Sequence, residues 1–148
     1  MSTTSQAGQY QDTRIDVKLV LSALWIAMLI VFAYVDIFGF FRADILDAAL
    51  DGKVATMGIT VDQAFLAFTT VYILIPTLMV FLSLVLRPRV NRIVNIVVAL
   101  IYAVSIIASC LGETWVYYLL GSAVEVVLLA VIVRTAWTWP RTQVASSL

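Results

Sequence analysis

The sequence contains no histidine and a single cysteine, Cys110. Without histidine, the chain cannot ligate haem or zinc through imidazole, and it has no imidazole general base. One cysteine permits neither an internal disulfide nor a Cys-x-x-Cys redox pair, which excludes quinone-coupled disulfide chemistry within the chain. The sequence also lacks a Gly-rich phosphate loop and a Gly-x-Ser-x-Gly nucleophile elbow. We therefore predict no cofactor and no metal site.

Charged residues are scarce as well, at 12% of the 148 residues, whereas 63% are hydrophobic. Soluble domains have about 25% charged and 45–50% apolar residues. A chain this small cannot bury so much apolar surface, so the excess must face lipid. The composition predicts a polytopic membrane protein whose first partner is the lipid bilayer. It excludes a soluble enzyme, a nucleic-acid binder and a disordered protein.

Long apolar stretches alternate with short charged segments along the chain. The stretches lie at about residues 17–40, 61–86, 91–112 and 115–138. A hydrocarbon core of about 30 Å needs about 20 helical residues, so each stretch is long enough to span it. The predicted fold class is an all-α, four-helix membrane bundle within residues 15–140. Residues 1–14 are polar and aperiodic, which predicts a disordered tail, and residues 141–148 form a second tail.

The basic residues predict the orientation of this bundle. One side carries Arg14, Lys18, Arg87, Arg89, Arg92, Arg134 and Arg141, which leaves Arg42 and Lys53 on the other side. By the positive-inside rule, both termini are predicted to be cytoplasmic. The bias also argues against insertion in both orientations.

The longest segment between two spans, residues 36–62, is therefore predicted to lie outside. Within it, residues 41–51 place Asp44, Asp47 and Asp51 on one helical face and apolar residues on the other. This pattern predicts a short amphipathic helix on the outer membrane surface. The three carboxylates could gather a divalent cation, but a solvated polar face is the simpler interpretation.

The ends of two predicted helices have local signals. Gly52 follows the outer amphipathic helix and is placed to cap its C-terminus. Thr60, with Gln63 three residues later, has the spacing of a capping box and is predicted to start the second span.

Glu125 is predicted near the middle of the bilayer, because it lies about 15 Å along the fourth span from Trp115. A carboxylate at this depth is costly, and such residues usually face the bundle interior and mark function. Tyr102 of the third span has a similar depth and is the predicted hydrogen-bond partner of Glu125. Gly121 and Ser122 would let these two spans approach closely.

Each predicted span carries a stripe of polar residues at helical spacing, and four such stripes imply a common interior, open enough for a ligand or a few waters. From the stripes we predict a ligand-binding set that consists of Glu125, Tyr102, Tyr118, Ser122, Trp25, Asn95, Asp36 and Tyr72. An alternative interpretation of the Ser, Thr and Asn residues is that they only join the helices by hydrogen bonds. In the second span, Pro76 lacks an amide proton and leaves the carbonyl of Tyr72 without its helical partner.

Several short motifs carry a family resemblance. They are LSALW at residues 21–25, Tyr-x-Asp-x-x-Gly at 34–39, Arg-x-Asn-Arg-x-x-Asn-Ile at 89–96, the Tyr-Tyr to Glu spacing at 117–125, and Ala-Trp-x-Trp at 136–139. With these motifs the chain resembles a bacterial family of small four-helix inner-membrane proteins of unknown function, loosely DoxX-like in architecture. The resemblance covers about residues 15–140. It implies a four-span bundle in the inner (cytoplasmic) membrane and implies no activity.

Three functions remain open at this point. The first is the binding or transport of a small apolar or cationic ligand, with Glu125 as counter-charge or proton carrier. The second is a non-catalytic accessory subunit that contacts a membrane-protein partner or further copies of itself. The third is an enzyme acting on lipid or quinone with Asp36 and Glu125 as acid and base, which is least favoured because the two lie at different depths.

Overall fold

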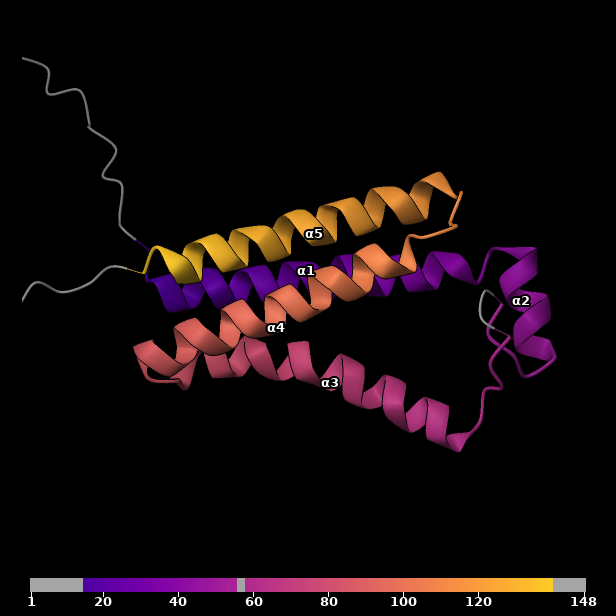
Figure 1. Cartoon of the computed structure of the whole chain (residues 1–148), viewed down its shortest axis with the longest axis horizontal. Coiled ribbons are helices and arrows are strands. Elements are labelled where there is room, and N and C mark those ends of the chain that lie inside the picture. Colours follow the sequence, from indigo (N-terminus) through magenta and orange to yellow (C-terminus); the bar gives the residue numbers. More distant parts are fainter. Residues whose placement is uncertain (1–14, 56–57, 140–148) are drawn as a thin grey trace, which may run out of the picture.

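Five helices account for most of the chain in the computed structural model, which describes residues 15–55 and 58–139 (Figure 1). In order they are α1 (Val17–Gly39), α2 (Ala43–Leu50), α3 (Gln63–Val85), α4 (Pro88–Ser109) and α5 (Val116–Trp137). Helices α1, α3, α4 and α5 are each long and apolar enough to cross a membrane. The described residues form no strand, so the predicted all-α fold class is confirmed. The two predicted tails, with Arg14 and Arg141, lie outside the described residues.

Side chains and proline define where the long helices begin. The carboxylate of Asp16 accepts from the amide of Lys18 and caps α1 at 2.7 Å. Helix α3 is capped in the same way by Asp62, which accepts from the amide of Phe65 at 2.8 Å. The predicted capping box of Thr60 and Gln63 is therefore wrong, because the aspartate directly before the helix supplies the cap. Pro88 occupies the first turn of α4, where no helical donor is lost.

The short helix α2 ends as its sequence predicts. Gly52 has a φ of 68°, a left-handed conformation that favours glycine. Its amide donates to the carbonyl of Ala49 at 3.0 Å, and the amide of Lys53 donates to that of Ala48 at 2.8 Å. These two bonds form a Schellman motif, so the predicted cap at Gly52 is confirmed. None of the α2 residues is buried, as a helix lying on a surface requires.

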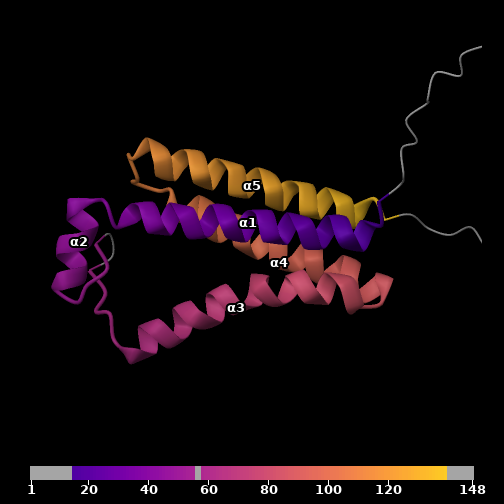
Figure 2. The same cartoon turned by 180° about the vertical axis from the view of Figure 1, so that it is seen from behind.

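The long helices run side by side, and the chain connects them at two opposite ends (Figures 1 and 2). Helix α2 and the α4–α5 loop lie at one end, which we call the α2 end. The start of α1, the α3–α4 turn and the end of α5 lie at the other, which we call the basic end because it carries Lys18, Arg87, Arg89, Arg92 and Arg134. Helix α3 leans away from the other long helices toward the α2 end (Figure 2).

The core is formed where α1, α4 and α5 pack together, with the second half of α3 beside them. Trp25, Leu129 and Ile132 are among its fully buried side chains. Gly121 of α5 faces α1, where a Cβ atom on this glycine would overlap the side chain of Val35. The prediction that Gly121 brings the third and fourth spans together is therefore wrong, since it permits close packing of the first and fourth.

Candidate functional site

A fully bonded polar cluster occupies the basic half of the bundle. Asn95 of α4 accepts from the indole Nε1 of Trp25 at 2.7 Å and from the hydroxyl of Ser83 at 3.2 Å. Its own amide nitrogen donates to the carbonyl oxygen and the side-chain oxygen of Asn91, at 2.9 and 2.6 Å. All of these side chains are buried. The cluster joins α1, α3 and α4, and its polar groups satisfy one another.

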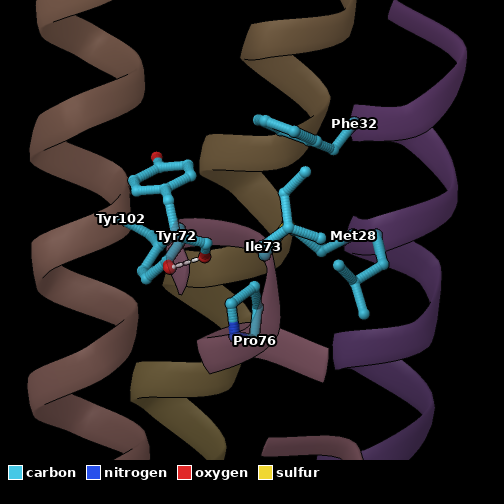
Figure 3. A pocket seen from close by; sticks show the side chains of 7 residues that line it. Met28, Phe32, Tyr72, Ile73, Pro76 and Tyr102 are labelled. Atoms are coloured by element: carbon cyan, nitrogen blue, oxygen red, sulfur yellow. Dashed lines mark hydrogen bonds between the residues drawn. The ribbon is translucent and has the colours of Figure 1, made fainter. Parts of the chain in front are cut away.

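The middle of the bundle is organised by Pro76 of α3 (Figure 3). The carbonyl of Tyr72, which has no helical donor because of Pro76, accepts a hydrogen bond from the hydroxyl of Tyr102. The two tyrosine rings also pack against each other in a tilted arrangement, with centroids 4.7 Å apart and planes at 33°. Tyr102 was predicted to bond Glu125. This prediction is wrong, because the hydroxyl of Tyr102 donates its hydrogen bond to the Tyr72 carbonyl instead.

A cavity of about 190 Å³ lies on the α2 side of this tyrosine pair. All four long helices contribute to its wall. The lining consists of Phe32, Val35, Asp36, Tyr72, Ser105, Ile106, Ser109, Tyr118, Ser122 and Glu125. Phe32 and Tyr72 also line an apolar void of only about 10 Å³ beside Pro76, toward the basic end. A void of this size is at the lower limit for one water molecule, so little open space continues beyond these two side chains. Phe32 and Tyr72 therefore form an aromatic layer that is the floor of the cavity.

Four hydroxyl groups of the cavity wall, those of Tyr72, Ser105, Ser109 and Tyr118, donate their protons to other protein groups. Ser105 donates to the carbonyl of Tyr102 at 2.9 Å, which makes the hydroxyl of Tyr72 the donor in its 2.6 Å bond to Ser105. In the same way Tyr118 donates to Ser109 at 2.9 Å, and Ser109 donates to the carbonyl of Ile106 at 2.8 Å. These tyrosines and serines therefore offer lone pairs to the cavity and no further donor.

Glu125 is the most enclosed charged group of the cavity, with 2% of its surface exposed. Its Oε1 atom is buried and has no hydrogen-bond partner within the described part of the chain. A buried polar atom without a partner costs about 1–3 kcal/mol, and more when it is charged. Asp36, which is exposed, brings a second carboxylate to the same wall, and no lysine or arginine from residues 15–55 or 58–139 lines it. The cavity is therefore rich in acceptors and lacks a cation.

A wider cavity of about 600 Å³ lies next to it at the α2 end. The two cavities share Val35, Asp36, Ser109 and Tyr118 in their walls, so Asp36 and Tyr118 lie at the boundary between them. Residues from α2 and from the segment that follows it, such as Ile45 and Lys53, form the far side of the wider cavity. The two cavities are therefore neighbours, and the boundary at Asp36 and Tyr118 lies between the α2 end and Glu125.

Arg42 joins the parts of the chain that surround this wider cavity. Its guanidinium contacts the carboxylates of Asp44 and Glu113 at 2.6 and 2.9 Å, and it lies 4.7 Å from the centre of the Trp115 ring. The hydrogen bond from Arg42 lowers the pKa of Asp44. Burial alone would raise the pKa of Glu113, but hydrogen bonds from Arg42 and from the amides of Trp115 and Thr114 outweigh it and lower the pKa. Arg42 therefore ties the α1–α2 junction to the α4–α5 loop.

The structure brings together part of the predicted ligand-binding set. Glu125, Asp36, Tyr72, Tyr118 and Ser122 line the cavity. The other three predicted residues lie elsewhere: Trp25 and Asn95 belong to the bonded cluster of the basic half, and Tyr102 bonds the Tyr72 carbonyl below the floor.

Sequence reasoning omitted other residues that line or frame this space. Ser105 and Ser109 belong to the polar stripe of α4, yet they were left out of the predicted set. Phe32 is an apolar residue within an apolar span, so nothing in the sequence distinguishes it as a cavity residue. Arg42 and Glu113 could have been recognised from the sequence, because Arg42 is one of the few basic residues at the α2 end and Glu113 is the single charged residue of a short loop.

The fold and the site define a multi-pass membrane protein with an acidic internal cavity. The profile of a family of unknown function (DUF6326) matches residues 9–146, and the chain belongs to this family. The predicted resemblance to a family without assigned activity is confirmed, whereas nothing links the chain to DoxX proteins in particular. No curated protein and no solved structure matches the chain.

Proposed function

We propose that this protein binds a small amphipathic amine in the cavity at Glu125, with the protonated amine on the carboxylate and the apolar part of the ligand against the aromatic side chains. The observation that carries the proposal is the buried, unpartnered Oε1 of Glu125 in a cavity without a basic residue in the described part of the chain. A protonated amine supplies both the charge and the N–H donor that this atom lacks. Asp36 adds a second negative charge in the same wall.

The hydroxyl groups favour an amine over other ligand classes. The hydroxyl groups of Tyr72, Ser105, Ser109 and Tyr118 donate within the protein, so an anion would find few donors in this wall. A ligand with N–H groups instead meets the lone pairs of Tyr72 and Tyr118 and the carboxylate of Glu125. The faces of Phe32, Tyr72 and Tyr118 also attract a cation.

Access to the cavity supports a ligand that arrives from the α2 end. The wider cavity there has a volume of about 600 Å³, within the range of about 300–1,000 Å³ that is usual for small-molecule sites. It adjoins the Glu125 cavity at Asp36, while Phe32 and Tyr72 lie on the opposite side of that cavity, beside a void of only about 10 Å³. By the positive-inside rule the α2 end faces outside, so we propose inner-membrane insertion with cytoplasmic termini and binding from the outer side.

Equilibrium binding to the purified protein in a neutral detergent tests this function. The probes are 2-(2-naphthyl)ethylamine, its N,N,N-trimethylammonium derivative and 2-(2-naphthyl)ethanol, which share the apolar part and differ in charge and N–H donors. We expect the amine to bind most tightly. Replacing Glu125 by glutamine keeps the shape of the side chain and removes the charge, and it should weaken amine binding about 10- to 100-fold, since hydrogen bonds to charged groups contribute about 1.5–3 kcal/mol.

The control is Asp47→Asn, which removes one negative charge from the exposed surface of α2 and leaves both cavity walls unchanged. Its affinity for the amine should stay within twofold of the wild type, and naphthylethanol binding should respond to neither variant. The proposal is refuted if Glu125→Gln binds the amine as tightly as the wild type. It is also refuted if both variants lose affinity equally, because this would indicate a general surface-charge effect.

A second candidate function, an accessory subunit of a larger membrane complex, is favoured by α3. Of the long helices, α3 buries the smallest share of its residues within the chain. A partner helix seated against the leaning half of α3 would cover this surface. Mild detergent extraction followed by native electrophoresis tests this function, and it predicts one stoichiometric partner that a polar substitution at Phe68, an exposed residue of α3, removes. Migration of all the protein as a monomer would contradict it.

A further inference from the structure

We propose that a groove between α4 and α5 at the basic end binds one anionic phospholipid, with the phosphate on Arg89 and Arg92 and an acyl chain along the apolar wall. This site is separate from the cavity at Glu125 and does not depend on the proposed amine-binding function. The groove has a volume of about 420 Å³ and is lined by Arg89, Arg92, Ile93, Ile96, Val97 and Trp137.

The charges of this groove are of one sign. Arg89 and Arg92 both contribute to its wall, and within residues 15–55 and 58–139 neither arginine forms a salt bridge. Arg92 is half-buried, and its guanidinium lies 5.2 Å from the centre of the Trp137 ring, which holds it between the two helices. Two arginines without carboxylate partners provide the fork-shaped donors that match a phosphate group.

The rest of the lining is apolar and extends along the helix from the arginines. Ile93, Ile96 and Val97 follow Arg92 over the next turn and a half, a rise of about 6–8 Å toward the bundle centre. Trp137 lies in the last turn of α5, at the level where indole rings favour the headgroup region. A ligand that fills the groove must therefore combine a negative charge at the membrane surface with an apolar chain directed inward.

This combination identifies the lipid source of the phosphate. A free phosphate or a phosphorylated metabolite would use only the arginines and leave the apolar wall in contact with bulk lipid. A zwitterionic lipid carries its own cation close to the phosphate, which weakens the attraction to the arginine pair. Basic pockets between membrane helices recognise anionic headgroups in this way. Phosphatidylglycerol has both an anionic headgroup without a cation of its own and acyl chains that match the apolar wall.

Native mass spectrometry of the full chain in a neutral detergent tests the proposal. The probes are dioleoyl phosphatidylglycerol and dioleoyl phosphatidylcholine, which share acyl chains and differ in headgroup charge. We expect one tightly held phosphatidylglycerol per chain. Each arginine near an anionic headgroup contributes about fivefold to binding, so the double variant Arg89→Gln/Arg92→Gln should bind this lipid about 25-fold more weakly.

A charge-matched control separates the groove from the general field of the basic end. The double variant Arg87→Gln/Arg134→Gln removes the same charge from exposed positions at the same end that do not line the groove. It should retain the lipid within about threefold. Equal loss of binding in the two double variants, or equal affinity of the wild type for the two lipids, would overturn the proposal.

The apolar part of the groove is tested independently. Val97→Trp fills the groove while both arginines and the apolar character of the surface remain, and it should reduce phosphatidylglycerol binding at least tenfold. Undiminished phosphatidylglycerol binding to this variant would refute the proposal that an acyl chain lies along the apolar wall. Displacement of the bound lipid by millimolar glycerol 3-phosphate would show that the phosphate alone is recognised and would overturn a lipid as the occupant.

Discussion

Replacing Tyr102 by phenylalanine should destabilise the bundle through a carbonyl group on another helix. The hydroxyl of Tyr102 donates to the carbonyl of Tyr72, which has no helical donor because residue 76 is a proline. After the substitution this acceptor has no protein partner. The neighbouring void of about 10 Å³ has an apolar lining, so a replacing water would find too few hydrogen-bond partners there.

The size of the effect follows from the cost of that unpaired carbonyl. Leaving a buried acceptor unsatisfied costs about 1–3 kcal/mol. Hydrogen bonds between membrane helices average only about 0.6 kcal/mol, because groups freed by mutation usually find other partners. Since α3 has lost its own donor at this position and water is excluded, we expect a loss of about 1–2 kcal/mol in the free energy of unfolding.

A double-mutant cycle measures this coupling. In a Pro76→Ala background, the amide of residue 76 can donate to the Tyr72 carbonyl in the ordinary helical manner. The Tyr102→Phe substitution should then cost no more than a few tenths of a kcal/mol. The assay is reversible unfolding in mixed micelles with increasing dodecyl sulfate, followed by far-ultraviolet circular dichroism.

Tyr72→Phe is the matched control, because it removes the hydroxyl of the neighbouring ring, which bonds Ser105 and not the carbonyl. Its effect should be the same with proline or alanine at position 76. Equal destabilisation by Tyr102→Phe in the two backgrounds would refute the reasoning, since the hydroxyl would then act independently of the proline.

Two further predictions concern the packing and the electrostatics of the bundle. Gly121→Ala places a methyl group against a β-branched side chain of α1 and should lower stability by about 1–3 kcal/mol in the same assay, whereas Gly39→Ala meets only ordinary contact at 3.4 Å and should be tolerated. Equal stabilities of the two variants would contradict this packing. The lowered pKa of Glu113 means that its pairing with Arg42 stabilises the fold above the ordinary glutamate pKa, about 4.3, and is lost as the pH falls through the lowered value. Hydrogen exchange of α2, corrected for the intrinsic rate at each pH, should therefore accelerate as the pH falls below this ordinary value, and Glu113→Gln should reduce this pH dependence to the part that Asp44 contributes through its own pairing with Arg42; an unchanged profile in that variant would contradict the assignment.

Much of the architecture could be predicted from residue order. The four apolar stretches coincide with the four long helices to within a few residues, because helix length and hydropathy are properties of a local segment. The C-cap at Gly52 was predictable for the same reason. The cap of α3 was assigned to Thr60 rather than Asp62, since two nearby polar residues compete for that position and the local sequence does not decide between them.

The pairing of polar side chains across helices was less predictable. Helical periodicity assigns Tyr102 and Glu125 to interior-facing stripes, but it does not set how far each helix rotates or which neighbour it meets. The rotation of α4 directs Tyr102 toward α3 and Asn95 toward Trp25, and this separates three predicted ligand-binding residues from the cavity. Gly121 shows the same limit, because its small size was recognised and its neighbouring helix was not.

The sequence by itself determined that this is a four-span, all-helical protein, that Glu125 lies deep within a span and that Pro76 leaves a backbone acceptor at mid-depth. These features depend on composition and on the rise along a single helix. Only the tertiary structure decided that Tyr102 satisfies the Tyr72 carbonyl and that Glu125 faces an open cavity with Asp36. Such contacts join residues far apart in the chain, and they depend on how four nearly uniform apolar surfaces rotate and pack against one another.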